Sequence, residues 1–452
     1  MLQRQYKQWE RILSYLVFVI STVVYLLTME KSASVWDCPE FITTFHKLEV
    51  GHPPGAPFYM LVYNFFSHFF PAGSRWIAIA ANSLSAILAG GTILILFRTI
   101  SHLIRRSYGL RSSMDPEYRL PSDQAILGLG GALVGALLFA FTDTFWYSAV
   151  EAEVYSFSSF FTAIVFYLML KWEETEDSAV ADRWLILIAY LMGLSVGVHL
   201  LNLLAIPAMA LIYYFKKQER PTWKGGVITV LVSFALIAII MFGIIQGVPQ
   251  IAGYFDLFFV NTLGLPFNSG LAFYMVLLIA TLVVTFCAAC SEQSRPNLLR
   301  IGFFCSVLLM GIPFMGEGWI VPLVIIAGLI WYLFSRKTLP GHALGLSTAA
   351  MFVFFIGLST YGVILIRANS DIPMNQNTPS DVFSLRYYLS REQYGSTPLI
   401  YGQTYASLPK YDARGNAVTT KSTTYRRAPK YNPSDKDKYI AVVSENWSSE
   451  TT

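Results

Sequence analysis

Acidic side chains and histidines crowd a short stretch that directly follows the first apolar run of the chain. Residues 34–55 read SVWDCPEFITTFHKLEVGHPPG and include Asp37, Glu40 and His52. A carboxylate held at the edge of a membrane can take the proton of an alcohol nucleophile, and a second acid or a histidine can orient it or hold a metal ion. These residue types therefore favour proton-transfer chemistry at a membrane surface, with Asp37 as general base and Glu40 as its support.

Further polar groups occur in or beside later apolar runs, in the stretches FWYSAVEAEVYSF and GVHLLN and where the last run ends. Arginine and histidine can hold a phosphate leaving group through charge-assisted hydrogen bonds. Together with His52, the candidate substrate-binding residues are Glu151, Glu153, Tyr155, His199, Asn202 and Arg367.

Each candidate also has a purely structural explanation. Asp37 can be the N-cap of a short interfacial helix that begins at Pro39, and Glu40 then simply favours the positive end of that helix. His52 can be a loop histidine beside a rigid proline turn. The sequence leaves these alternatives open.

The later candidates have structural alternatives as well. Glu151 and Glu153 can be solvated carboxylates in a short loop, and Arg367 is typical of an interfacial anchor. His199 lies between two closely joined apolar runs, where a polar side chain is costlier to bury. We therefore weigh it more strongly as a functional residue.

Composition defines the class of protein that must position these groups. The 452-residue chain is 54% hydrophobic and 13% charged, whereas soluble domains carry about 25% charged residues. Continuous apolar runs of membrane-spanning length recur, which predicts an all-α polytopic membrane protein rather than a β-barrel. The net charge of +4 indicates no nucleic-acid partner, and the four cysteines are too few for a disulfide framework.

We predict a bundle of about eleven membrane spans. Lys and Arg cluster before the first predicted span and after each even-numbered one up to the tenth, which places the N-terminus in the cytoplasm. Asp37 and the other candidates then face the opposite side. The predicted spans are 11–28, 76–104, 125–142, 156–171, 184–198, 200–215, 226–247, 271–290, 299–315, 319–335 and 344–366.

Two domains follow from this pattern. Residues 1–366 form the transmembrane domain, whose first extracytoplasmic loop, 29–75, carries the WDCPE and GHPPG motifs. Residues 367–452 form a polar extracytoplasmic segment with strand-like pieces, TPLIYG and KYIAVVS. The segment stops at ENWSSETT without a closing element, as a piece of a longer protein would.

The arrangement suits group transfer from a lipid-phosphate carrier better than transport. Transporters place polar residues near the bilayer midplane on broken helices, whereas most predicted spans here have apolar centres. The alternative is a non-catalytic transporter or scaffold for lipid-linked intermediates, with its carboxylates binding rather than reacting.

Several stretches resemble glycosyltransferase family 117, a bacterial group found in Bacteroidota and related to the protein O-mannosyltransferases of the GT-C superfamily. They are WDCPEF, GHPPGAP, FWYSAVEAEVYSFSSFFTA, LMGLSVGVHLLNLL and SDVFSLRYYLSREQYG. The resemblance implies a GT-C-like transmembrane helix bundle. It also implies that Asp37 is the catalytic base of the first loop, that Glu40 is the second acid, and that Glu151 and Glu153 take the place of a second acidic motif.

The resulting hypothesis is an inverting glycosyltransferase of the bacterial inner membrane, with its active site and C-terminus in the periplasm. It would move a sugar from a polyprenyl-phosphate-linked donor to Ser or Thr hydroxyls of an exported protein. A glycan or lipid acceptor is the alternative. No cofactor is expected, and a divalent metal is possible but not favoured, because the spaced acids form no obvious ligand triad.

Overall fold

The structure is a computed structural model that describes the chain except residues 111–116, 292–294, 316–317, 337, 396–401, 403, 406, 417, 433 and 448–452. The described part is mostly helical, and ten of its helices are long and apolar enough to cross a membrane. The predicted class, an all-α polytopic membrane protein, is confirmed. All eleven predicted spans coincide with apolar helices, but Ile320–Ser335 has only 16 residues and is not among the ten.

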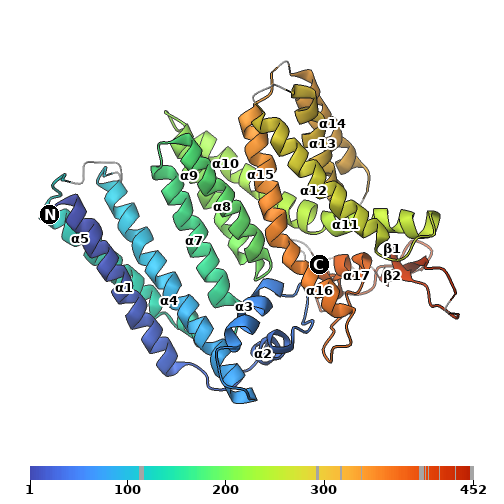
Figure 1. Ribbon diagram of the computed structural model, residues 1–452, viewed down its shortest axis with the longest axis horizontal. Helices are drawn as coiled ribbons and strands as arrows, with labels where there is room; N and C mark the ends of the chain where they lie inside the picture. Colours follow the sequence, from blue (N-terminus) through green and yellow to red (C-terminus); the bar gives the residue numbers. More distant parts are fainter. Residues whose placement is uncertain are drawn as a thin grey trace. The chain divides into compact units, whose positions relative to one another are not determined.

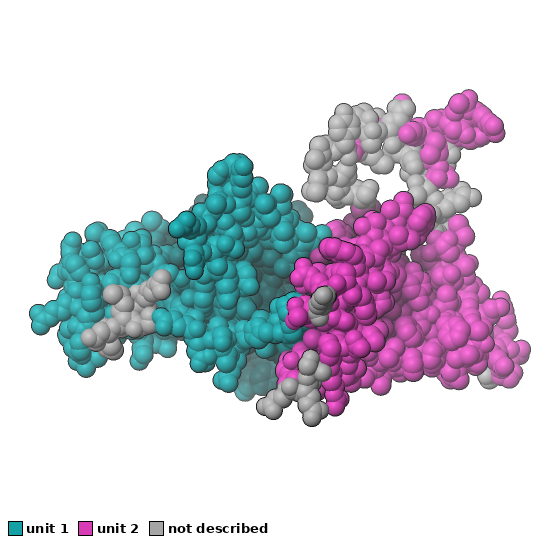
Figure 2. All heavy atoms as spheres, turned by 90° about the horizontal axis from the view of Figure 1, so that it is seen from above, with its two compact units in different colours: residues 1–51, 55–238, 340–374 teal, residues 52–54, 239–339, 375–452 magenta. Residues whose placement is uncertain are grey.

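The chain folds into two compact units, coloured separately in Figure 2. Unit 1 comprises residues 1–51, 55–238 and 340–374, and unit 2 comprises residues 52–54, 239–339 and 375–452. The predicted boundary after residue 366 and the side of the membrane on which the C-terminal segment lies stay predictions.

Unit 1 consists of long helices with short helices between them (Figure 1). The short helices α2 and α3 lie at the end of α1 and α4 that is remote from the N-terminus. The long helices are α1 (Gln3–Thr28), α4 (Ser74–Ser107), α5 (Ser122–Ala140), α7 (Val154–Glu174), α8 (Ser178–Val196), α9 (Ile206–Lys217), α10 (Trp223–Ala238) and α15 (Gly341–Leu358). The short ones are α2 (Cys38–Lys47), α3 (Pro57–Ser67), α6 (Asp143–Ala149), the 3₁₀ turns η1 (Leu200–Ala205) and η5 (Ser359–Tyr361), and α16 (Gly362–Ala368).

Small residues set the packing of α8 against α15. A Cβ atom on Gly193 would lie 2.3 Å from the carbonyl oxygen of Phe354, and one on Gly357 would lie 2.4 Å from the amide nitrogen of Leu194. The two backbones therefore touch, as is common where membrane helices cross at small residues. Because α15 packs on α8, the segment that follows α15, η5 and α16, lies near the loops of the first half of the chain.

A hydrophobic core joins α1, α4, α5 and α6. It is built from small and aromatic side chains, including Tyr25, Ala89, Ala136 and Phe145. The Tyr25 hydroxyl donates a hydrogen bond to the carbonyl oxygen of Ala140 at 2.7 Å, so its polar end is satisfied inside the apolar core. Helix α6 is thereby held beside the end of α1, from which the acidic first loop departs.

Unit 2 combines membrane-length helices with the C-terminal strand pair. Its elements are the π-helical turns η2 (Ile239–Ile245) and η3 (Phe258–Thr262), α11 (Gly247–Leu257), α12 (Ser269–Cys290), α13 (Pro296–Leu309), the 3₁₀ turns η4 (Ile312–Phe314) and η6 (Glu392–Tyr394), α14 (Ile320–Ser335), α17 (Val382–Leu389), β1 (Thr419–Arg427) and β2 (Tyr439–Trp447). The antiparallel β1–β2 pair confirms the strand predicted at KYIAVVS, whereas TPLIYG, apart from Gly402, lies outside the described residues.

A buried acid ties this strand pair to the helices of unit 2. Asp256 has no exposed surface, and its carboxylate accepts hydrogen bonds from the Tyr439 hydroxyl at 2.7 Å and from the amide of Gly270 at 3.0 Å. Its oxygens also accept from the amides of Asn268 and Leu271. The acid thus satisfies the amides at the start of α12 and holds β2 through a tyrosine that the sequence did not single out.

Candidate functional site

The first loop forms a short helix for local reasons. Helix α2 begins at Cys38 with Pro39 in its first turn, and it ends where Leu48 adopts a left-handed conformation, with φ 51° and ψ 55°. Cys38, Phe41 and Phe45 on one face are buried, so the opposite face is left for polar residues. The short helix that the structural alternative for Asp37 required is present, and it begins at Cys38, one residue before Pro39.

Asp37 stands at the N-cap position of α2 but does not cap it. Its side chain makes no hydrogen bond to the first turn and is exposed. A carboxylate oxygen of Asp37 lies within 4.8 Å of one from Glu40. A Cβ atom on Gly51 would lie 2.7 Å from Oε1 of Glu40, so the glycine allows the loop to pack on that side chain. Two carboxylates at this spacing can supply oxygen ligands to a divalent cation.

The second acidic loop is attached to the segment that leads to Asp37. The Ser34 hydroxyl donates a hydrogen bond to Oε2 of Glu151 at 2.5 Å, and the amide of Glu30 donates to the carbonyl of Val150 at 3.0 Å. The two acidic motifs, which are more than a hundred residues apart in sequence, therefore lie side by side. Glu151 is half-buried and engaged rather than a freely solvated carboxylate.

Glu153 lies deeper, above a pair of buried tyrosines. The carboxylate of Glu153 accepts a hydrogen bond from the amide of Val154 at 3.2 Å. Glu153 as a whole is only 6% exposed. Tyr59 and Tyr63 stack with ring centroids 3.8 Å apart. Burial raises the pKa of Tyr59 well above its ordinary value, with Tyr63, Cys38 and Glu153 adding to the shift. This hydroxyl stays protonated and offers a donor beneath α2.

Tyr155 and His199 meet at the neighbouring corner. Their rings lie edge to face with centroids 5.5 Å apart, and Nδ1 of His199 accepts a hydrogen bond from the amide of Leu201 at 3.1 Å. Asn202 is fully buried, and its side-chain amide donates to Oγ of Ser195 at 2.8 Å. His199 and Tyr155 are therefore presented together, whereas Asn202 lies inside the packing of this corner.

Arg367 of α16 reaches the far end of α2. Its Nε donates to the carbonyl of Leu48 at 2.7 Å and a terminal nitrogen donates to the carbonyl of Lys47 at 3.1 Å. Carbonyls at a helix C-terminus lack partners within the helix, and a cation there also complements the helix dipole. The guanidinium is thus engaged in holding α2, and its predicted contact with a donor phosphate stays a prediction.

His52 is assigned with Pro53 and Pro54 to unit 2. Within that unit, its carbonyl oxygen accepts a hydrogen bond from the Tyr388 hydroxyl at 3.3 Å. The role of its imidazole as a substrate contact stays a prediction.

Two buried groups near the site were not recognised from the sequence. Glu49 is 1% exposed, and neither of its carboxylate oxygens has a hydrogen-bond partner among the described residues. The Tyr59 hydroxyl is likewise buried without such a partner in the described part of the chain. No local pattern marks either residue, because burial here follows from backbone contacts such as the amide of Val50 with the carbonyl of Met374.

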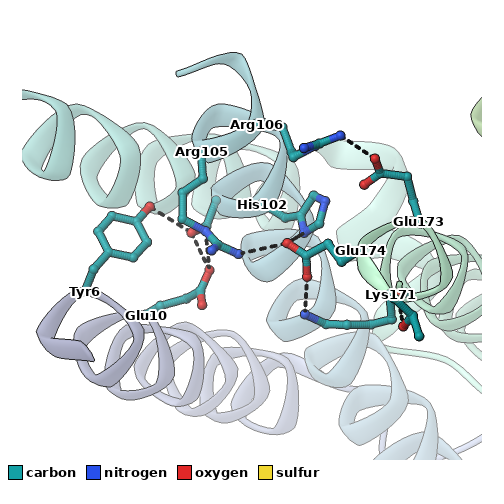
Figure 3. A network of polar contacts seen from close by, with 10 residues as sticks. Tyr6, Glu10, His102, Arg105, Arg106, Lys171, Glu173 and Glu174 are labelled. Carbon is teal, nitrogen blue, oxygen red and sulfur yellow. Dashed lines mark hydrogen bonds and ion pairs between the residues drawn. The ribbon is translucent and has the colours of Figure 1, made fainter. Parts of the chain in front are cut away.

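A buried ionic network occupies the N-terminal end of unit 1 (Figure 3). Oε1 of Glu174 lies 3.9 Å from a terminal nitrogen of Arg105 and 3.5 Å from Nδ1 of His102, and Oε2 lies 3.3 Å from Nζ of Lys171. Nε of Arg105 also lies 4.0 Å from Oε1 of Glu10. The sequence predicted only Lys and Arg at this end, because their carboxylate partners are spread over distant helices.

Comparison with known proteins bears on the first half of the chain. Residues 37–222 match the model of the family described as the Protein O-mannosyl-transferase TMEM260 N-terminal domain. The match begins at Asp37 and includes every predicted site residue except Arg367.

Two curated relatives agree with this match. The chain is 23% identical over 234 residues, half of its length, to Protein O-mannosyl-transferase tmem260 of Dictyostelium discoideum, and 28% identical over 182 residues, 40% of its length, to Protein O-mannosyl-transferase TMEM260 of Mus musculus. The aligned parts span 26% and 22% of those proteins.

The chain is a distant relative of protein O-mannosyltransferase TMEM260. This supports the predicted relation to protein O-mannosyltransferases and suggests a glycosyltransferase. The assignment to glycosyltransferase family 117 stays a prediction. Because the chain covers only about a quarter of each relative, the activity of those whole proteins reaches this chain only as a proposal.

Proposed function

We propose that the protein is an inverting glycosyltransferase that moves a sugar from a polyprenyl-phosphate carrier to Ser or Thr hydroxyls of exported proteins. The reaction takes place on the side of the membrane opposite the N-terminus, which we place in the periplasm of a bacterium with the protein in its inner membrane. The lipid bilayer delivers the donor, and the polar segment after residue 366 receives the acceptor.

One observation carries this proposal. The stretch similar to O-mannosyltransferases begins at Asp37, and Asp37 is an exposed acid at a helix start whose side chain does no capping. An N-cap acid that served the helix would bond to the first-turn amides. The carboxylate is instead left available beside Glu40, as a general base requires.

The proposed step needs little more than orientation and a base. The acceptor oxygen attacks the anomeric carbon of the donor sugar while Asp37 takes the hydroxyl proton. The bond between that carbon and the phosphate oxygen breaks, and the phosphate leaves with the electron pair on its lipid carrier. Attack opposite the leaving group inverts the configuration, and the net reaction moves one sugar and one proton.

The remaining candidates divide into contacts and supports. Tyr155 and His199 present a ring pair at one corner, which suits packing against a sugar and hydrogen bonding to a phosphate. Glu40 lies beside Asp37 and is assigned as the second acid, which orients the acceptor hydroxyl. We also assign to the donor side His52, Glu153 and Asn202, whose roles no contact here tests.

Mass spectrometry of exported proteins tests the proposal directly. Cells that produce the wild-type chain should carry hexose-modified Ser or Thr on exported proteins, and cells with Asp37→Asn at equal membrane abundance should lose the modification. Asp143→Asn, an exposed acid in the first turn of α6, is the matched control and should keep it.

The other outcomes identify the alternatives. If Asp37→Asn keeps the protein modification, Asp37 is not the base. If protein modification is absent throughout but a surface polysaccharide or glycolipid changes with the variant, the acceptor is a glycan or lipid. If neither changes while the lipid-linked intermediate redistributes, the chain is a transporter or scaffold.

A further inference from the structure

The connector between α1 and α2, residues 29–36, is fastened to the rest of unit 1 by contacts at alternate residues. The carbonyls of Glu30 and Ser32 accept hydrogen bonds from the side-chain amide of Asn82 at 2.7 and 3.1 Å. The amide of Glu30 donates to Val150. Ser34 comes next, and its hydroxyl bonds to Glu151. Between Ser34 and Asp37 no further contact is described.

The Ser34–Glu151 bond differs from the others in this connector. It joins two side chains, whereas the contacts of Glu30 and Ser32 use the connector's backbone. Its acceptor is a carboxylate oxygen, and hydrogen bonds to an ionised carboxylate are stronger than those between neutral groups. The residues that follow it, Val35 and Trp36, are exposed, so little else holds them.

The stretch from Ser34 to Asp37 is therefore held at one end by this bond and at the other by α2, whose Phe41 amide donates to the carbonyl of Asp37 at 2.9 Å. Trp36 has a φ of 64°, a left-handed conformation that costs a bulky residue about 1–2 kcal/mol and persists only where its surroundings impose it. The bond at Ser34 on one side and the start of α2 on the other bracket that residue. Together they determine where the carboxylate of Asp37 points.

We propose that Glu151 is a positioning residue for Asp37, acting through Ser34, rather than a contact of the donor or acceptor. This inference rests on the proposed function, because it assigns Asp37 the role of base. A shift of about 1 Å in a catalytic group can lower a rate roughly a hundredfold, so loosening the connector lowers kcat without weakening substrate binding.

Kinetics of four variants test this role: Ser34→Ala, Glu151→Ala, the double variant, and Glu151→Gln. We expect Ser34→Ala and Glu151→Ala to lower kcat to a similar extent, roughly ten- to hundredfold, with donor KM unchanged. The double variant should be no slower than the slower single variant, because both remove one bond. Glu151→Gln keeps an acceptor oxygen and should retain most of the activity.

Hydrogen–deuterium exchange of the peptide covering residues 30–41 gives a second readout that needs no activity. Exchange should speed up equally in Ser34→Ala and Glu151→Ala. The matched control is Ser148→Ala, since the Ser148 hydroxyl bonds to the carbonyl of Thr144 in its own helix. It should leave both exchange and kcat unchanged.

Three results would overturn the proposal. They are a donor KM that rises in Glu151→Ala but not in Ser34→Ala, a double variant as slow as the product of the single effects, or exchange that does not change. If exchange changes as expected while the wild-type protein transfers no sugar to any acceptor, the positioning contact stands and the proposed function fails.

Discussion

The two ends of unit 1 treat their charges in opposite ways. At the N-terminal end, Glu174 pairs with Arg105 and Lys171, and the buried imidazole of His102 lies beside it (Figure 3). The end that carries α2 and α3 holds several acids, among them Asp37, Glu40 and Glu151. There Asp37 is exposed and makes no capping bond.

The difference separates a structural use of charge from a chemical one. A buried charge must be compensated by partners, and the carboxylate of Glu174 is compensated by Arg105 and Lys171. A carboxylate whose surroundings are held by other contacts keeps its oxygens available. At the α2 end, Arg367 binds a backbone carbonyl and Ser34 binds Glu151. Neither contact uses the carboxylate of Asp37.

The largest expected effect concerns the open end. Asp37→Asn should lower kcat about 10²- to 10⁴-fold, because the amide cannot take the acceptor proton. The thermal unfolding midpoint in detergent should not change, since the side chain caps nothing. Transfer of a labelled sugar from lipid-linked donor to an acceptor peptide measures the rate. An unchanged rate would show that the acid at the α2 end is not used for catalysis.

The reciprocal experiment concerns the closed end. Glu174→Ala should lower the free energy of unfolding by about 3–5 kcal/mol, because Arg105 is left buried without this partner. The rate per folded molecule should be unchanged. Glu176→Ala, an exposed acid two residues further on, should have no effect on unfolding. A stable variant with lost activity would show that the network takes part in function.

A third experiment examines the support of α2. Arg367→Ala should lower the free energy of unfolding by about 2 kcal/mol, since it removes charge-assisted bonds to the carbonyls of Leu48 and Lys47. Arg367→Lys should recover part of this loss, because an ammonium group can reach one carbonyl. If stability is kept while donor KM rises, the arginine binds the donor phosphate instead.

The smallest effect is expected at the ring pair. His199→Asn keeps a side-chain acceptor for the amide of Leu201 but loses the ring that faces Tyr155. Donor KM should rise about tenfold, the equivalent of one hydrogen bond to a charged group, with stability unchanged. An unchanged KM together with lower stability would show that His199 has a structural role instead.

Local patterns predicted much of the fold and part of the site. Apolar runs predicted each of the ten membrane-length helices found among the described residues, and Pro39 was interpreted as the start of a short helix, which the structure begins at Cys38. The partners of Glu151 and Arg367 could not be predicted, because Ser34 and Leu48 lie 117 and 319 residues away in sequence. Nothing in the sequence around Glu49 indicated that it is buried.

The amino-acid sequence alone determined that the chain is a polytopic helical membrane protein, because the length and polarity of each span are local properties. It also singled out Asp37, because an acid beside a span is costly wherever the chain folds. Only the tertiary structure decided which charges are compensated. Compensation depends on distances between helices, and such distances are absent from any single stretch of residues.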